Sequence, residues 1–233
     1  MSQKLLFLDI ETVSECPNYN KLDDSWKELW ALKSRYYAEK EPNKSLSDLY
    51  SDKAAIYAEF GRIICISLGL MDDHKFRVKS LLGDESDLLK AFFAIILKSY
   101  SDARNSIFVG HNIKEFDIPY ICRRAVINKI DIPTSLELSG RKPWEINHIH
   151  DTLEMWKFGD YKHFTSLDLL ARCLNLPSSK QDISGKDVGR VYWEENDIER
   201  ISKYCQQDVV LTARVYRRLK GEGDFTDEQI VFI

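Results

Sequence analysis

An apolar segment near the N-terminus ends in two acidic residues, and it constrains the fold more than any other stretch. It reads Leu5-Leu6-Phe7-Leu8-Asp9-Ile10-Glu11, which predicts a buried strand. Residues two apart on a strand project from one face, so Asp9 and Glu11 should leave the strand end together. Two carboxylates this close raise each other's pKa unless a cation lies between them. Oxygen ligands select hard cations such as Mg²⁺ or Mn²⁺, although solvated acids at a strand end are the more frequent explanation of such a pair.

The rest of the chain alternates between short strands and helices. Apolar, β-branched or alternating segments predict four further strands, at residues 63–68, 76–80, 107–110 and 148–151. Apolar residues at helical spacing predict helices that begin near residues 84, 116, 166 and 197. This order favours an α/β fold with a mixed five-stranded sheet and helices on both faces.

Residues 17–60 do not follow that alternation. They combine many charges with aromatic side chains, which include Trp26, Trp30, Tyr36, Tyr37, Tyr50, Tyr57 and Phe60. We expect a helical insertion between the first two strands. Because the chain carries no internal repeat and no linker-like tract, it is predicted to form a single domain over residues 1–233.

Composition and charge exclude several classes of protein. Of the 233 residues, 44% are hydrophobic and 30% are charged, which is typical of a soluble globular protein, and no apolar run approaches the roughly 18 residues of a membrane span. Five cysteines without a C-x-x-C pair predict reduced thiols in a cytoplasmic protein and no zinc site. A net charge of −4 argues against a uniformly basic surface, but it is compatible with a local basic groove.

A further acid follows the strand predicted at residues 107–110. The segment Gly110-His111-Asn112-Ile113-Lys114-Glu115-Phe116-Asp117 predicts a glycine turn and then a helix with Asp117 in its first turn. The helix dipole favours an acid there, so plain capping is one interpretation. In a functional interpretation, Asn112 binds the sugar or phosphate of a nucleotide and Phe116 meets a base face. His111 at this turn is more simply structural.

The last predicted helix carries Tyr204-Cys205-Gln206-Gln207-Asp208. Positions four apart lie on one helical face, so Tyr204 and Asp208 should point the same way. Asp208 would add a fourth carboxylate, and the Tyr204 hydroxyl would lie beside an attacking water. A Tyr–Asp pair on an amphipathic helix is common by itself, so the order of all three motifs matters more than any one.

Together the three motifs resemble those of the DEDD exonuclease superfamily, in its tyrosine-bearing (DEDDy) subgroup, which has the ribonuclease-H-like fold. More closely, the chain is similar to the proofreading exonuclease domain of family B DNA polymerases and to free-standing predicted 3'–5' exonucleases of that kind. The resemblance runs from residue 4 to about residue 219, except that the 17–60 insertion has no counterpart. The matching residues are Asp9-Ile10-Glu11, then Asn112 with Phe116-Asp117, and then Tyr204-Cys205 with Asp208 and Leu211.

The resemblance implies a two-metal hydrolysis of the terminal phosphodiester that releases nucleoside 5'-monophosphates. It implies that the four carboxylates bind two Mg²⁺ or Mn²⁺ ions and that Tyr204 orients the attacking water. The implied catalytic residues are Asp9, Glu11, Asp117, Tyr204 and Asp208, and all of them except Tyr204 are implied metal ligands. The implied substrate contacts are Ile10, Thr12, His111, Asn112 and Phe116.

The expected partner is a single-stranded 3' end, with DNA favoured over RNA, and no membrane. An RNA exonuclease with the same acids is an open alternative, because the sequence does not show how a 2'-hydroxyl would be met. An inactive nucleic-acid-binding module is the second alternative, and the presence of every acid and the tyrosine argues against it. A phosphatase with an aspartyl nucleophile ranks low, because it usually needs a second aspartate where Glu11 stands.

Basic side chains could line an approach groove for the strand, although each single one is more simply a solvated charge. The candidates are Arg123, Arg124, Arg141, Lys142, Lys157, Lys162, Lys180, Lys186 and Arg190.

Overall fold

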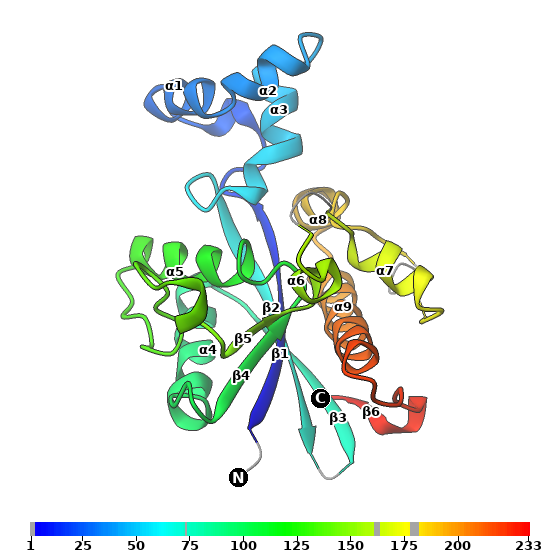
Figure 1. Ribbon diagram of the computed structural model, residues 1–233. Coiled ribbons are helices and arrows are strands. Elements are labelled where there is room, and N and C mark those ends of the chain that lie inside the picture. Colours follow the sequence, from blue (N-terminus) through cyan, green and yellow to red (C-terminus); the bar gives the residue numbers. More distant parts are fainter. Residues whose placement is uncertain (1–2, 73, 161–163, 178–181) are drawn as a thin grey trace.

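The computed structural model describes residues 3–72, 74–160, 164–177 and 182–233, which build a six-stranded sheet with helices on both faces (Figure 1). The sheet order is β5-β4-β1-β2-β3-β6. Strand β1 is antiparallel to β2 and parallel to β4, so the mixed α/β architecture is confirmed. The strands are β1 (Lys4–Ser14), β2 (Gly61–Asp72), β3 (Lys75–Leu82), β4 (Ser106–Gly110), β5 (Ile149–Asp151) and β6 (Ile230–Phe232).

The predicted number of five strands is wrong, because β6 adds a sixth. This three-residue strand pairs in parallel with the edge of β3, where Ile230 lies opposite Phe76. Three residues are too few to show the alternation on which strand prediction depends. The strand forms because the segment that follows α9 brings the chain back to the β3 edge of the sheet.

The prediction that Asp9 and Glu11 stand at a strand end is also wrong, because β1 continues to Ser14. The neighbouring β4 stops earlier, and its last pair with β1 joins Phe7 to Val109. The acids therefore lie within β1 but beyond the end of β4. The β1–β2 register shifts between Glu11 and Thr12, a bulge of the kind that redirects side chains next to functional sites.

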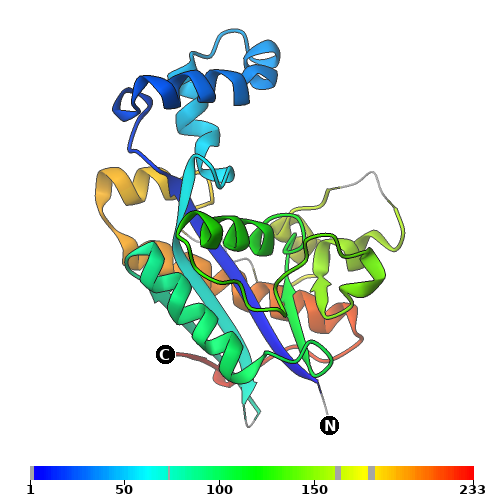
Figure 2. The ribbon, with the colours of Figure 1, turned by 90° about the vertical axis from the view of Figure 1, so that its left-hand side faces the viewer.

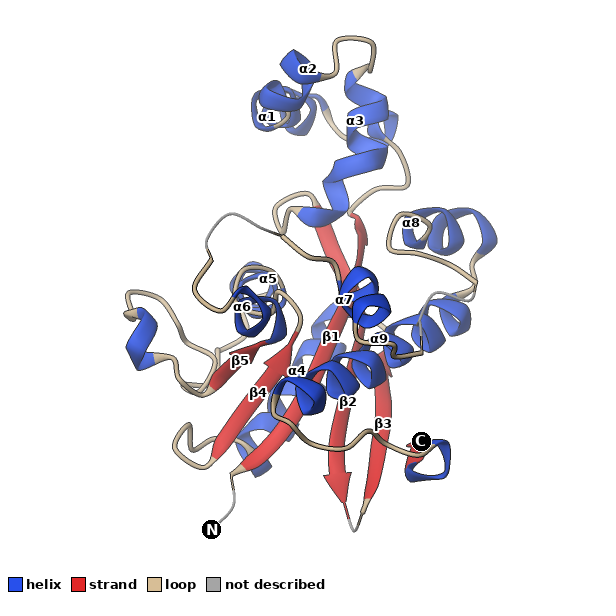
Figure 3. Cartoon of the chain, turned by 45° about the vertical axis from the view of Figure 1, so that its right-hand side comes forward, coloured by secondary structure: helices blue, strands red, loops and turns tan. Residues whose placement is uncertain are grey.

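Helices cover both faces of this sheet. α9 crosses one face, in contact with β1, β2 and β3 (Figure 3), while α4 and α5 cover the other (Figure 2). The predicted caps are confirmed, since Asp84 accepts from Ser86 N and Ser166 from Leu169 N. Within the described residues, no helix is long and apolar enough to cross a membrane. The helices that follow the insertion are α4 (Glu85–Ser99), α5 (Asp117–Ile127), α6 (Thr152–Lys157), α7 (Leu167–Cys173), α8 (Val188–Arg190) and α9 (Ile198–Leu219).

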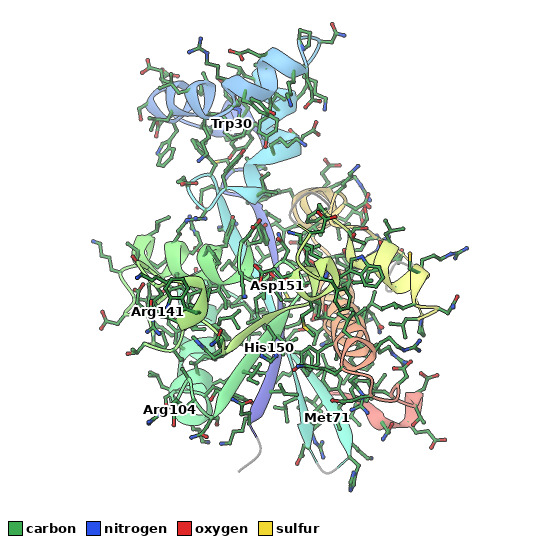
Figure 4. The ribbon with its side chains drawn as sticks, viewed as in Figure 1. Trp30, Met71, Arg104, Arg141, His150 and Asp151 are labelled. Atoms are coloured by element: carbon green, nitrogen blue, oxygen red, sulfur yellow. The ribbon has the colours of Figure 1, made fainter. Side chains whose placement is uncertain are left out.

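The insertion between β1 and β2 is helical, as predicted, and it projects beyond one end of the sheet (Figure 1). Its helices are α1 (Asp24–Lys33), α2 (Arg35–Lys40) and α3 (Leu46–Lys53). Trp30 is fully buried at its centre (Figure 4), packs edge-on against Tyr50 and Phe60, and donates its indole N–H to Leu46 O at 3.0 Å. The aromatic richness of residues 17–60 thus forms a small separate core.

Candidate active site

Strand β1 presents Asp9 and Glu11 on the face that α9 covers. Between them, Ile10 points to the opposite face and packs in the core under α4 and α5. Glu11 is 8% exposed, and its side chain shares the α9 face with Asp9 because the two alternate with Ile10 along the strand. Glu11 is therefore buried, and Asp9 is half-buried.

Helix α5 adds Asp117 as its first residue. The side chain is 3% exposed, and its Oδ1 accepts from the Ile10 backbone N–H at 3.2 Å. This bond fixes Asp117 to the β1 residue between the two acids.

The turn before α5 is held by a further acid, Asp151, at the end of β5 (Figure 4). Asp151 accepts from the backbone N–H groups of Asn112 at 2.8 Å, Lys114 at 3.2 Å and Leu153 at 2.9 Å. Asn112 adopts a positive φ of 65°. At Gly110 a Cβ atom would lie only 2.6 Å from the Ile113 side chain, so the close turn requires glycine. We conclude that Asp151 positions the turn that delivers Asp117.

Helix α9 brings in the third motif from the other side of the acids. The buried Cys205 Sγ lies 3.3 Å from Asp9 Oδ2 and 3.5 Å from Asp9 O. Ligand atoms of Asp9, Glu11 and Cys205 all lie within 4.8 Å of one another. Tyr204 and Asp208 are one helical turn apart on α9, and the Asp208 carboxylate lies close enough to the Tyr204 hydroxyl to raise its pKa.

The acids raise one another's pKa. For Asp9, burial raises the pKa most, followed by the charges of Asp117 and Asp208, while the Cys205 hydrogen bond lowers it. For Glu11, burial again contributes most, followed by Asp9 and Asp208. Burial raises the pKa of Asp117 to about 7. Full ionisation of such a cluster is unfavourable without a cation, and its oxygen donors suit a hard divalent ion.

The Tyr204 hydroxyl is kept protonated by its surroundings. Burial raises its pKa most, and the negative charges of Asp208, Glu11 and Asp9 raise it further. At neutral pH Tyr204 is therefore a hydrogen-bond donor next to the acids. That state suits a group that orients a water or a phosphate oxygen.

The predicted substrate contacts of the first motif lie away from the acid-bearing face. The Ile10 side chain is 4% exposed and belongs to the core. Thr12 follows the bulge, and its Oγ1 donates to Ala55 O at 2.8 Å, at the base of the insertion. Of these two residues, Ile10 is linked to a site acid through its backbone N–H, which donates to Asp117.

The predicted contacts of the second motif are partly occupied in holding the fold. His111 lies 2.9 Å from the Thr152 hydroxyl through Nδ1 and 2.9 Å from Thr165 O through Nε2, and burial lowers its pKa. A structural role explains both bonds. Phe116 packs at the edge of the core, with its ring 5.4 Å from that of Tyr120.

The candidate groove residue Arg124 is buried instead of lining a groove. It is 6% exposed, and it binds the Glu85 carboxylate at 2.6 Å and the Ala58 carbonyl at 2.9 Å. Its neighbour Arg123 is exposed. Lys162 and Lys180 lie outside the described residues.

The sequence analysis did not predict the roles of two residues of the site, Asp151 and Cys205. Asp151 closes a predicted strand, just as Asp9 and Glu11 were expected to, so its position at a strand end was the available signal. Cys205 was noticed only as part of the third motif. Its contact with Asp9 depends on the distance between α9 and β1, which no local pattern reveals.

Comparison with known proteins identifies the family. Residues 56–231 match the family described as predicted 3'-5' exonuclease related to the exonuclease domain of PolB. A DNA polymerase of Archaeoglobus fulgidus is 29% identical over 166 residues, which cover 67% of this chain and 20% of the polymerase. DNA polymerase 1 of Pyrococcus abyssi is 26% identical over 198 residues, which cover 74% of this chain and 25% of that protein.

The chain thus spans about a fifth to a quarter of the length of these curated relatives. The family match begins after Asp9 and Glu11, so the place of these two acids in the site rests on the geometry described above. The matched residues include α5, which carries Asp117, and α9, which carries Tyr204 and Asp208. This chain belongs to the family of predicted 3'-5' exonucleases related to the exonuclease domain of PolB.

Proposed function

We propose that this protein is a metal-dependent 3'–5' exonuclease that hydrolyses the terminal phosphodiester of single-stranded DNA and releases nucleoside 5'-monophosphates. One observation carries the proposal. Three elements far apart in the sequence, β1, α5 and α9, bring acids together: burial and the neighbouring acids raise the pKa of Asp9 and Glu11, and burial raises the pKa of Asp117. Folding around such repulsion is unfavourable unless a bound cation offsets it, so the cluster is typical of a functional site.

The donor set fits Mg²⁺ or Mn²⁺, which prefer oxygen ligands. Asp9, Glu11, Asp117 and Asp208 would hold these ions through their carboxylate oxygens. Bound cations of this kind neutralise charge on a phosphate and lower the pKa of a coordinated water. The Cys205 thiol, whose pKa is raised by burial, stays protonated and orients Asp9.

Tyr204 would orient the attacking water through its hydroxyl, which stays protonated beside the acids. The neighbouring Asp208 carboxylate, which raises the pKa of that hydroxyl, would accept its proton in a hydrogen bond and so fix its direction. The water would give up its proton to the solvent as its oxygen bonds to phosphorus, and the bond from phosphorus to the 3' oxygen of the penultimate nucleotide would break. That oxygen would take up a proton from the solvent and become the new 3'-hydroxyl. Most of the rate enhancement then comes from positioning and charge neutralisation.

Digestion of matched single-stranded DNA and RNA with Mg²⁺ or Mn²⁺ tests the proposal. We expect nucleoside 5'-monophosphates from DNA, no product in EDTA, and protection when the 3' end is blocked. Faster digestion of RNA would reassign the substrate. Release from the 5' end, or of nucleoside 3'-phosphates, would refute the proposed reaction.

A further inference from the structure

Arg62, on β2, lies on the same face of the sheet as the acids. The β1–β2 register pairs Glu11 with Cys65 and Val13 with Arg62, and cross-strand partners project from one face. Val13 packs in a cluster with Ile201 of α9. Arg62 therefore lies on the α9 side, two residues beyond Glu11 along β1, which is about 7 Å.

A single π-helical turn, Val191–Glu195, places two aromatic rings beside this arginine. The guanidinium carbon of Arg62 lies 5.1 Å from the Trp193 ring centroid and 5.8 Å from that of Tyr192. Arg62 Nη2 donates weakly to the Tyr192 hydroxyl at 3.4 Å. π-Helical turns are uncommon and frequently occur at functional sites.

Two buried donors in this group lack an acceptor. Arg62 Nε and Trp193 Nε1 have no hydrogen-bond partner among the described residues. Both atoms can only donate, so the group that satisfies them must be an acceptor. Arg124 and Arg200 are paired with carboxylates, whereas Arg62 forms no ion pair within the described part of the chain. An anion is therefore the fitting ligand.

The group adjoins the candidate active site. Tyr192, Trp193 and Tyr204 pack against one apolar cluster, which includes Val13 and Ile201. α8 and the π-helical turn lie beside the ends of β1 and β2, next to the base of the insertion (Figure 1). A DNA strand that reaches the acids along this face of the sheet would pass Arg62.

We propose that Arg62, Tyr192 and Trp193 form a second binding site for the substrate strand, where a phosphate upstream of the scissile one is held. This inference rests on the proposed function. The Arg62 guanidinium and the Trp193 indole N–H donate to phosphate oxygens, for which arginine is well suited. An aromatic ring meets a base face, an interaction that tolerates any sequence.

Substrates of different length test this site. Arg62→Met keeps the apolar stem of the side chain and removes the guanidinium. The control, Arg77→Met, makes the same change on β3, near the turn that joins β2 to β3. For a single-stranded DNA oligonucleotide we expect Arg62→Met to lower kcat/KM about 10-fold, mainly through KM, as for a lost charged hydrogen bond. On the p-nitrophenyl ester of thymidine 5'-monophosphate, which has no upstream phosphate, it should act like wild type. Arg77→Met should act like wild type on both.

Salt dependence of strand binding gives a second readout that a purely structural role would not change. We would measure it by fluorescence anisotropy in the Asp208→Asn background, where the strand stays intact. Loss of one phosphate contact should reduce the slope of log Kd against log salt by about 0.7. Trp193→Phe, which keeps a ring but loses the N–H, should weaken binding less than Arg62→Met.

Two results would overturn the site. One is an unchanged KM and salt slope in Arg62→Met, and the other is an equal loss on the oligonucleotide and the ester. A different result would refute only the proposed function. In that case the wild type hydrolyses neither the oligonucleotide nor the ester, but Arg62→Met still reduces the salt dependence of DNA binding.

Discussion

At the residue scale, Asp9 has more neighbours that disfavour its ionised form than neighbours that favour it. The Cys205 thiol lowers its pKa, whereas burial and two neighbouring acids raise it. The shared faces of Asp9 with Glu11, and of Tyr204 with Asp208, follow from strand and helix periodicity, so the sequence predicts them. The burial of Arg124 does not follow in this way, because its partner Glu85 lies 39 residues away and no local pattern links them.

Replacing Tyr204 by Phe tests its role in orienting water. The ring and the helix packing survive, so the fold and metal affinity should hardly change. We expect the single-turnover rate on a single-stranded oligonucleotide to fall by about 10²–10³, the usual effect of losing one positioned polar group. A change of less than about threefold, under 1 kcal/mol of barrier, would leave Tyr204 as a packing residue only.

The stability of the metal-free protein should depend on pH through Asp117. Its carboxyl has a pKa of about 7 in the folded state and about 4 when unfolded. Between these values the unfolded chain releases a proton that the folded protein keeps. The free energy of unfolding should therefore fall as pH rises through this window, by at most about 1.4 kcal/mol per pH unit from this group.

Urea unfolding in EDTA between about pH 5 and pH 7 measures this effect. Asp117→Asn, which keeps the oxygen that accepts from Ile10 N, should show a shallower fall than wild type. Saturating Mn²⁺ should also flatten it, because metal ligands bind deprotonated. Identical slopes for wild type and Asp117→Asn in EDTA would contradict the pKa assigned to Asp117.

At the scale of elements, α5 joins the site to the base of the insertion. Its first residue is Asp117, and further along the helix the Tyr120 hydroxyl donates to Ala55 O at 2.9 Å. Arg124 then binds Ala58 O, Glu85 of α4 and Glu15, which follows β1. The insertion itself could be predicted as helical from its composition. Its anchorage to α5 could not, because it depends on long-range backbone acceptors.

Arg124→Met should strongly destabilise the fold, because it leaves the Glu85 charge buried without its partner. We expect a loss of about 3–5 kcal/mol in the free energy of unfolding. The double variant Arg124→Met/Glu85→Gln, which removes both charges, should recover part of that loss. Arg123→Met, at the exposed neighbouring position, should change stability by under about 0.5 kcal/mol. Equal losses in the single and double variants would show that the ion pair is not the cause.

At the scale of the whole molecule, strand and helix order predicted the mixed sheet, its two covered faces and the insertion. The sixth strand and the length of β1 were missed, because each is set by pairing between distant segments instead of by a local pattern. The sequence placed the acids on three predicted elements. Their desolvation and mutual repulsion emerge only when α5 and α9 pack on opposite sides of β1.

The proposed reaction can be observed directly on a 5'-labelled single strand of DNA incubated with Mn²⁺ and the purified protein. We expect a ladder of labelled products that shortens stepwise from the 3' end, stops in EDTA, and is absent with Asp9→Asn. That variant should remain folded, because removing one of several repelling acids does not destabilise the metal-free site. An undiminished ladder with folded Asp9→Asn, or no shortening by the wild type with either Mn²⁺ or Mg²⁺, would contradict metal-dependent 3'–5' hydrolysis at this site.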